Sequence, residues 1–165
     1  MPEESSGIQR AGAITYYLLL RWMAGAESIT TSQIASHVEV DYHTAHALME
    51  DLGRLPFFHR VEGYHSASLD FPIWGIRGIA PRELSVPCRA SLVAYLLVYT
   101  TLACDMGITV RQLCSLLGLK RDAVLNMLDH LSAADSTTPI YCDGPYWKAV
   151  TCHWVIARKH DTHLQ

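Results

Sequence analysis

The sequence predicts a mainly α-helical protein with small β-hairpins, built from two tandem units that are related by an internal repeat. The main observation is that residues 29–52 align without a gap on residues 108–131, at an offset of 79 positions. Their apolar positions coincide, and a helix-length apolar segment precedes each copy while a strand-like segment follows it. Because such a repeat is the mark of duplicated structural units, we expect the 165 residues to form two units of about eighty residues each.

The first unit, residues 1–78, should open with a polar tail over residues 1–6 and a helix over about residues 8–25. Ser5 or Ser6 can cap this helix, because a side-chain oxygen there accepts an amide proton of the first turn. The helix is apolar nearly all round, which indicates burial on more than one side.

Two short helices are predicted next, over residues 31–37 and 42–53, with a tight turn at Glu39 between them. A threonine and a glutamine three positions later form a capping box before the first helix of each copy. These pairs are Thr30 with Gln33 and Thr109 with Gln112. Asp41 can cap the helix that starts at Tyr42.

A β-hairpin should end the first unit, with strands at residues 57–62 and 71–76. Residues 79–87 contain two prolines and are predicted to link the units. The second unit, residues 88–165, should repeat this order, after Ser85 and Pro87 begin a helix that runs to Met106 and is capped by Gly107. Its remaining elements are predicted as helices at about 110–116 and 120–132, strands at 139–142 and 146–156, and a polar tail from 157.

Apolar and small residues at fixed places in both copies form a helix-turn-helix pattern. The second copy has them at Leu113, Cys114, Leu117, Gly118, Leu119, Val124 and Met127. The first has Ile34, Ala35, Val38, Val40, Ala45 and Leu48, with Glu39 where glycine is usual. With a hairpin after each copy, the chain resembles the winged helix-turn-helix superfamily over nearly its whole length.

That resemblance implies that the third helix of each unit enters the major groove of double-stranded DNA and that the hairpins act as wings. In the second unit it indicates contacts from Arg111, Lys120, Arg121, Asp122, Asn126 and Lys148. Arg121 suits guanine and Asn126 suits adenine, while Lys120 and Arg111 suit phosphates. The alternative is that residues 120–122 are simply a solvated helix start.

The first unit offers Tyr42, His43, Thr44 and His46 on the corresponding helix, and Arg60, beside His59 and His65, in its hairpin. The helix side chains can hydrogen-bond to bases, although Glu50 and Asp51 on the same helix would repel phosphate. His59, Arg60 and His65, in or near the hairpin, could touch the minor groove as a wing does. An acidic, histidine-rich surface that docks a protein partner is the equally supported alternative.

The formal net charge is −3, which is unusual for a protein that binds phosphates. Residues 1–79 hold five Lys and Arg against nine Asp and Glu, whereas residues 80–165 hold eight against seven. Charge therefore favours the second unit as the DNA-binding one.

Five cysteines without close pairing indicate a reducing compartment, and Cys114 and Cys104 fall at predicted core positions. The start of the chain does not resemble a signal peptide, and the apolar run at residues 91–104 is short for a membrane span. We therefore expect a cytoplasmic protein. No motif indicates catalysis or a cofactor, and the spacing of His43 and His46 is weak support for zinc, so we expect neither enzyme activity nor a metal.

The wide apolar surface of each unit's first helix needs a partner. A homodimer through these helices is the preferred interpretation, and packing of the two units on each other within one chain is the alternative. The sequence as a whole favours a sequence-specific regulator of transcription. The rival function is a winged-helix module that binds protein, of the segregation, replication or inhibitor type.

Overall fold

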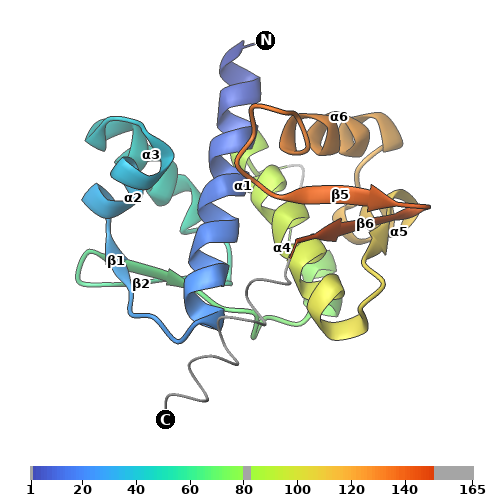
Figure 1. The fold of residues 1–165 in the computed structure, drawn as a ribbon, viewed down its shortest axis with the longest axis horizontal. Coiled ribbons are helices and arrows are strands. Elements are labelled where there is room, and N and C mark those ends of the chain that lie inside the picture. Colours follow the sequence, from blue (N-terminus) through green and yellow to red (C-terminus); the bar gives the residue numbers. More distant parts are fainter. Residues whose placement is uncertain (1, 80–82, 151–165) are drawn as a thin grey trace.

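Two long helices lie side by side at the centre of the molecule, and the smaller elements are arranged on either side of them (Figure 1). The computed structural model describes residues 2–79 and 83–150, with side chains from residue 6 onward. The central helices are α1 (Pro2–Met23) and α4 (Val86–Cys104). Within the described residues the fold is mainly helical with two small antiparallel sheets, as the sequence predicts.

Helix α1 begins earlier than the sequence analysis predicts. Residues 2–6 belong to the helix, so the expected polar tail and the cap at Ser5 or Ser6 are wrong. A proline at the first helical position and acidic residues in the first turn both favour a helix start at Pro2. The helix ends at Met23, close to the predicted end.

The predicted caps of the short helices are confirmed. Both capping boxes are closed. The backbone N–H of Gln33 donates to the Thr30 hydroxyl over 3.2 Å, and the backbone N–H of Gln112 donates to the Thr109 hydroxyl over 3.1 Å. These boxes start α2 (Thr31–Val38) and α5 (Val110–Leu117). The Asp41 carboxylate accepts the Thr44 amide over 2.7 Å and starts α3 (Tyr42–Leu52). Helix α6 (Arg121–Leu131) begins after Lys120, whose side chain makes no capping bond.

Helix α4 starts where the sequence predicts and ends earlier. Ser85 is its N-cap, and its hydroxyl accepts the Cys88 amide. The left-handed C-cap is Asp105, with φ 58°, and the expected C-cap at Gly107 is therefore wrong. Gly107 has another reason to be glycine, because a Cβ there would lie 2.3 Å from the carbonyl oxygen of Trp147.

Each sheet has three strands, one more than the predicted hairpin. The first contains β1 (Ile29–Thr30), β2 (Phe58–Val61) and β3 (Tyr64–Ala67) in the order β1-β3-β2. The second contains β4 (Ile108–Thr109), β5 (Ile140–Asp143) and β6 (Tyr146–Ala149) in the order β4-β6-β5. The two-residue strands β1 and β4 were not predicted, because a pair of residues is too short to show a strand pattern.

The first hairpin is tighter than predicted, and its second strand lies elsewhere. Glu62 and Gly63 form a two-residue turn in which both φ angles are positive, 51° and 84°, which suits the twist of a β-hairpin. The predicted strand at 71–76 is wrong: residues 73–78 form a 3-10 helix, η1 (Ile73–Gly78). In the second hairpin the described strand ends at Ala149, and the predicted strand residues 151–156 lie outside the described part of the chain.

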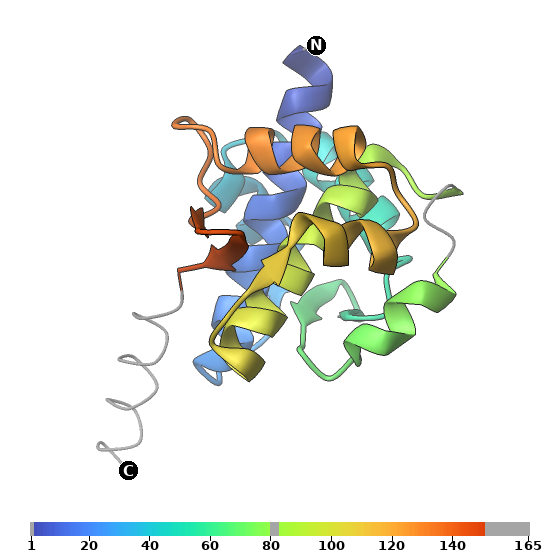
Figure 2. The same cartoon turned by 90° about the vertical axis from the view of Figure 1, so that its right-hand side faces the viewer.

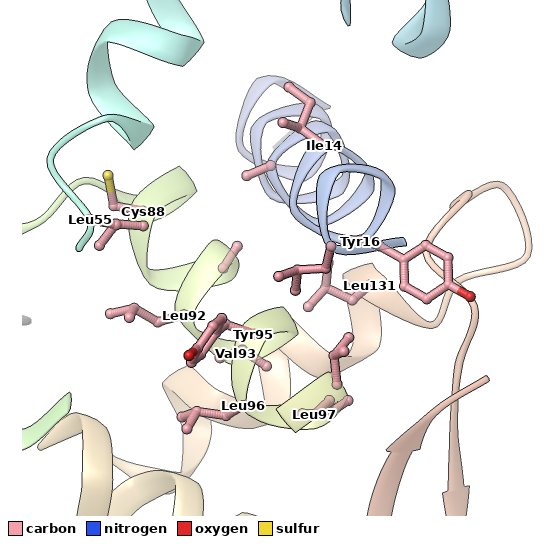
Figure 3. Close-up of a cluster of buried hydrophobic side chains, with 14 of the residues drawn as sticks. Ile14, Tyr16, Leu55, Cys88, Leu92, Val93, Tyr95, Leu96, Leu97 and Leu131 are labelled. Atoms are coloured by element: carbon pink, nitrogen blue, oxygen red, sulfur yellow. The ribbon is translucent and has the colours of Figure 1, made fainter. Parts of the chain in front are cut away.

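Both halves of the chain contribute to one apolar core between α1, α4 and α6 (Figure 3). The fully buried Tyr95 ring stacks on Phe57 with the ring centroids 4.1 Å apart. At the contact between α1 and α4, the buried hydroxyls of Thr15 and Ser91 lie 2.6 Å apart. Packing within one chain therefore covers much of the apolar surface of both helices, as the intramolecular alternative requires; the homodimer stays a prediction.

Two smaller expectations change with the structure. Cys104 is exposed rather than in the core, whereas Cys88 is fully buried, and burial raises the pKa of its thiol to about 11. Helix α4 has 19 residues and is long and apolar enough, by length and composition alone, to cross a membrane. The sequence analysis considers only residues 91–104, which are too few to do so. Its apolar window is 67% buried inside the fold, as in many core helices.

Candidate nucleic-acid interface

Helix α6 divides into a buried face and an exposed one. Val124, Leu128 and Leu131 are fully buried, which fixes the rotation of the helix. Arg121 and Asn126 are consequently exposed. Because these two residues lie five positions apart, they are separated by more than one turn along the helix.

Three cations lie at the amino ends of α5 and α6. Arg111 is exposed in the first turn of α5, and Lys120 and Arg121 are exposed where α6 begins. Within the described part of the chain, none of the three makes an ion pair or a side-chain hydrogen bond. Since the amino ends of helices also carry a partial positive charge, this surface can bind phosphate.

The other two predicted contacts of this unit differ from these cations. Asp122 is exposed in the first turn of α6, where a carboxylate favours the helix but opposes phosphate. Lys148 on β6 is only 17% exposed, and its Nζ lies 3.5 Å from the Asp143 carboxylate across the hairpin. The charge of Lys148 is therefore already partly compensated.

In the first unit, aromatic rings occupy the exposed start of α3. Tyr42 is 50% exposed and stacks on His46, with the centroids 5.9 Å apart and the rings within 6° of parallel. The Tyr42 and His43 rings form a T-shaped pair with their centroids 6.1 Å apart. Thr44 is half-buried, and its amide is the group that Asp41 caps. This surface can stack and hydrogen-bond, but it has no permanent cation of its own.

The predicted wing cation of this unit is paired. Arg60 on β2 donates a short hydrogen bond to the Glu50 carboxylate on α3. This hydrogen bond and the charge of the guanidinium hold the pKa of Glu50 below its usual value. His46 Nε2 lies 3.9 Å from the same carboxylate. An open groove of about 230 Å³ beside this pair lies between α3 and the hairpin.

The two histidines of the first hairpin, His59 and His65, both bond to neighbouring side chains. His65 is 3% exposed, and its Nε2 lies 2.9 Å from the Thr31 hydroxyl. The expectation that His65 could touch the minor groove is therefore wrong. His59 is exposed but shares a 3.0 Å hydrogen bond with Ser68. Among the described residues, no group of three or more His, Cys, Asp or Glu side chains could hold a metal ion.

The structure adds one residue that the sequence analysis did not select. Arg77 on η1 donates a 3.1 Å hydrogen bond to the Ser115 hydroxyl on the exposed side of α5. The available signal was a period of three in residues 73–79, which is typical of a 3-10 helix rather than a strand.

Unpaired positive charge thus lies at the amino ends of α5 and α6. The start of α3 and the β2–β3 hairpin instead carry aromatic rings and paired charges. Comparisons with protein-family models, with curated proteins and with solved structures find no match to this chain.

Proposed function

We propose that the chain consists of two tandem winged helix-turn-helix units and binds double-stranded DNA in a sequence-specific manner, as a regulator of transcription. The observation that carries this proposal is the set of unpaired, exposed cations at the amino ends of α5 and α6. Phosphates are the ligands that such a set recognises, and an exposed helix with adjacent polar side chains can enter a major groove.

The element order supports the two-unit interpretation. A helix, a short strand, two short helices and a hairpin occur in this order before η1 and again after it. In both cases the short strand pairs with the second strand of the hairpin. The turn between the short helices is left-handed in both, at Glu39 with φ 58° and at Gly118 with φ 65°. This shared order and turn geometry support the proposal of two winged helix-turn-helix units.

The residues of the second unit then have separate roles. Arg121 donates to a guanine edge and Asn126 pairs with an adenine edge, each contact contributing about 1–3 kcal/mol of discrimination. Lys120 and Arg111 bind phosphates and set the register of α6 on the duplex. The hairpin β5–β6 acts as the wing. No catalysis and no cofactor are part of this proposal, and its setting is the cytoplasm.

A second function is favoured by a specific feature of the first unit. Its arginine at the wing is paired with Glu50, and the hairpin exposes two apolar side chains, Val61 at 70% and Tyr64 at 48%. Exposed apolar groups beside compensated charge suit a protein surface better than a phosphate backbone. This unit is therefore the place where a protein partner, or a second copy of the chain, would bind.

The decisive experiment is selection of genomic DNA fragments by the intact chain at low salt, followed by binding measurements on a selected site. Arg121→Ala should lower the affinity by about 1–3 kcal/mol, because it removes a bidentate base contact. Lys148→Ala is the matched control: its charge is already compensated by Asp143, so its loss should weaken binding less. If no fragment is retained, the regulator proposal fails and a search for protein partners follows.

Asn126→Ala separates specific from general binding. The variant should accept more sequences at the adenine position while its affinity for unrelated DNA stays nearly unchanged. An equal loss on every sequence would show that Asn126 does not read a base. Light scattering on the intact chain tests the homodimer, and a monomer at about micromolar concentration would leave only the pairing of units within one chain.

A further inference from the structure

The 3-10 helix η1 has three distinct faces, because a 3-10 helix repeats every three residues. Residues 73–79 read Ile-Trp-Gly-Ile-Arg-Gly-Ile. Isoleucines therefore share one face, glycines the second, and Trp74 and Arg77 the third. The isoleucine face is the buried one, since Ile76 is completely inaccessible. The Trp74–Arg77 face is the exposed one.

The core fixes the position of η1. Ile76 belongs to the main apolar cluster, and the Phe71 carbonyl just before the helix accepts a hydrogen bond from the buried Tyr95 hydroxyl of α4. The Phe71 ring in turn packs against Gly75, where an added Cβ would lie 2.9 Å from its Cζ. The exposed face of η1 is thus presented by a segment that is tied to the centre of the fold.

Arg77 joins this face to the helix-turn-helix of the second unit. Its guanidinium donates to Ser115, which lies in the last turn of α5, three residues before the turn at Gly118. Figure 2 shows η1, coloured green, beside α5 on the side of the molecule where the chain turns into α6. Arg77 has no carboxylate partner within the described residues, so most of its five donors are free.

Trp74 is the most exposed large apolar side chain in the described part of the chain, at 77%. An exposed tryptophan on a segment that is anchored to the core is a candidate interaction site, because binding a partner would remove its large apolar surface from water. A tryptophan next to an arginine without a carboxylate partner suits a sugar-phosphate backbone. The ring can pack on deoxyribose while the guanidinium donates two hydrogen bonds to a phosphate.

We infer that the Trp74–Arg77 face of η1 is a further DNA-binding element, which contacts the duplex backbone beside the groove that α6 reads. The inference rests on the proposed function and extends it, because this element lies outside both helix-turn-helix segments. Charge complementarity selects DNA as the partner. With Arg111, Lys120 and Arg121, Arg77 brings to four the arginines and lysines without a carboxylate partner on the described parts of η1, α5 and the start of α6.

The salt dependence of DNA binding tests this inference. For a site selected by the wild-type chain, Arg77→Ala should lower the slope of log affinity against log salt by about one, and should do so equally for specific and unrelated DNA. Arg77→Lys keeps the charge and should keep the slope. Ser115→Ala removes only the tether of the guanidinium, so it should weaken binding less than Arg77→Ala.

Tryptophan fluorescence gives a second readout. DNA should change the emission of the wild-type chain, and Trp74→Phe should remove most of that change while retaining most of the affinity. If the wild-type chain binds DNA but Arg77→Ala leaves the slope unchanged, this inference fails and the proposed function stands. If the wild-type chain binds no DNA, both fail. If Trp74→Ala abolishes self-association instead of altering DNA binding, this face is a protein contact and the inference is wrong.

Discussion

Glu50 of α3 binds the guanidinium of Arg60 on β2, and this pair joins the third helix of the first unit to its hairpin. Both side chains are about half exposed, at 53% and 48%, so the pair adds little to stability. Its larger effect is on the electrostatic field at the surface, because the Glu50 carboxylate cancels the positive charge that Arg60 would otherwise give the hairpin.

Replacing Glu50 by glutamine should therefore make the first unit a better phosphate binder. Glu50→Gln releases Arg60 and removes a negative charge, so we expect tighter DNA binding and a salt slope that is steeper by about one. Glu27→Gln removes the same charge from the loop before β1 and is the control. Equal behaviour of the two variants would mean that the first unit does not approach DNA, and would favour its protein-binding alternative.

The turns before α3 and α6 allow a direct exchange of residues. Glu39 adopts φ 58° and ψ 48°, and Gly118 adopts φ 65° and ψ 30°. A residue with a side chain in this left-handed region costs about 1–2 kcal/mol. Glycine avoids this cost, but part of the benefit is lost because glycine has more conformational freedom in the unfolded chain. Glu39→Gly should raise the free energy of unfolding by about 0.5–1 kcal/mol in denaturant titrations, and Gly118→Glu should lower it by about 1 kcal/mol. A loss of stability in Glu39→Gly would show that the Glu39 side chain has a role that the backbone argument omits.

Gly12 and Gly7 lie on the same helix and should respond oppositely to alanine. At Gly12 an added Cβ would lie 2.3 Å from Cδ2 of Leu131, where α1 crosses α6. Gly12→Ala should therefore cost about 1–3 kcal/mol through overpacking. At Gly7 the nearest atom, on Pro87, is 3.5 Å away, so Gly7→Ala should stabilise the helix by about 0.5–1 kcal/mol. Thermal unfolding of both variants checks the pair, and similar shifts in the two would contradict the close helix crossing.

His65 should make the protein less stable at mildly acidic pH. Burial lowers its pKa from 6.5, with smaller contributions from the charges of Arg60 and His46, while Glu50 opposes the shift. The unfolded chain therefore binds a proton more readily than the native one, and the free energy of unfolding falls as the pH drops below 6.5. Denaturant titrations at about pH 8 and about pH 5.5 measure the slope of the free energy of unfolding against pH.

His65→Gln keeps a polar partner for Thr31 and should flatten the slope. His37, whose pKa is also lowered by burial, supplies the comparison variant His37→Gln, which should leave the contribution of His65 to the pH dependence in place. An unchanged slope in His65→Gln would assign the acid sensitivity to another group.

Local chemistry accounts for what the sequence could predict. The capping boxes at Thr30 and Thr109 and the cap at Asp41 depend on residues three positions apart, and all three are present in the structure. The fixed spacing of buried positions such as Ala45 and Val124 likewise follows from helical periodicity. These features needed no knowledge of the tertiary fold.

The incorrect predictions concern features that depend on contacts with other segments of the fold. The sequence does not reveal strand β3, because Glu62 occupies a left-handed turn position where glycine or asparagine is expected, and this hides the two-residue hairpin. The isoleucine and aromatic residues of the segment 71–76 favour a strand, although residues 73–79 have a period of three and form a 3-10 helix as far as Gly78. The pairing of Arg60 with Glu50 joins residues ten positions apart on different elements, so no local pattern reveals it.

The shared core of α1 and α4 has a mechanical consequence. Because these helices are packed on each other within one chain, the distance between α3 and α6 is set by side-chain packing and not by the reach of residues 79–87. If α3 and α6 bind one duplex, their fixed distance requires a single spacing between the two DNA sequences that they contact. Lengthening the connection would leave that separation unchanged, whereas repacking the contact between Thr15 and Ser91 would alter it.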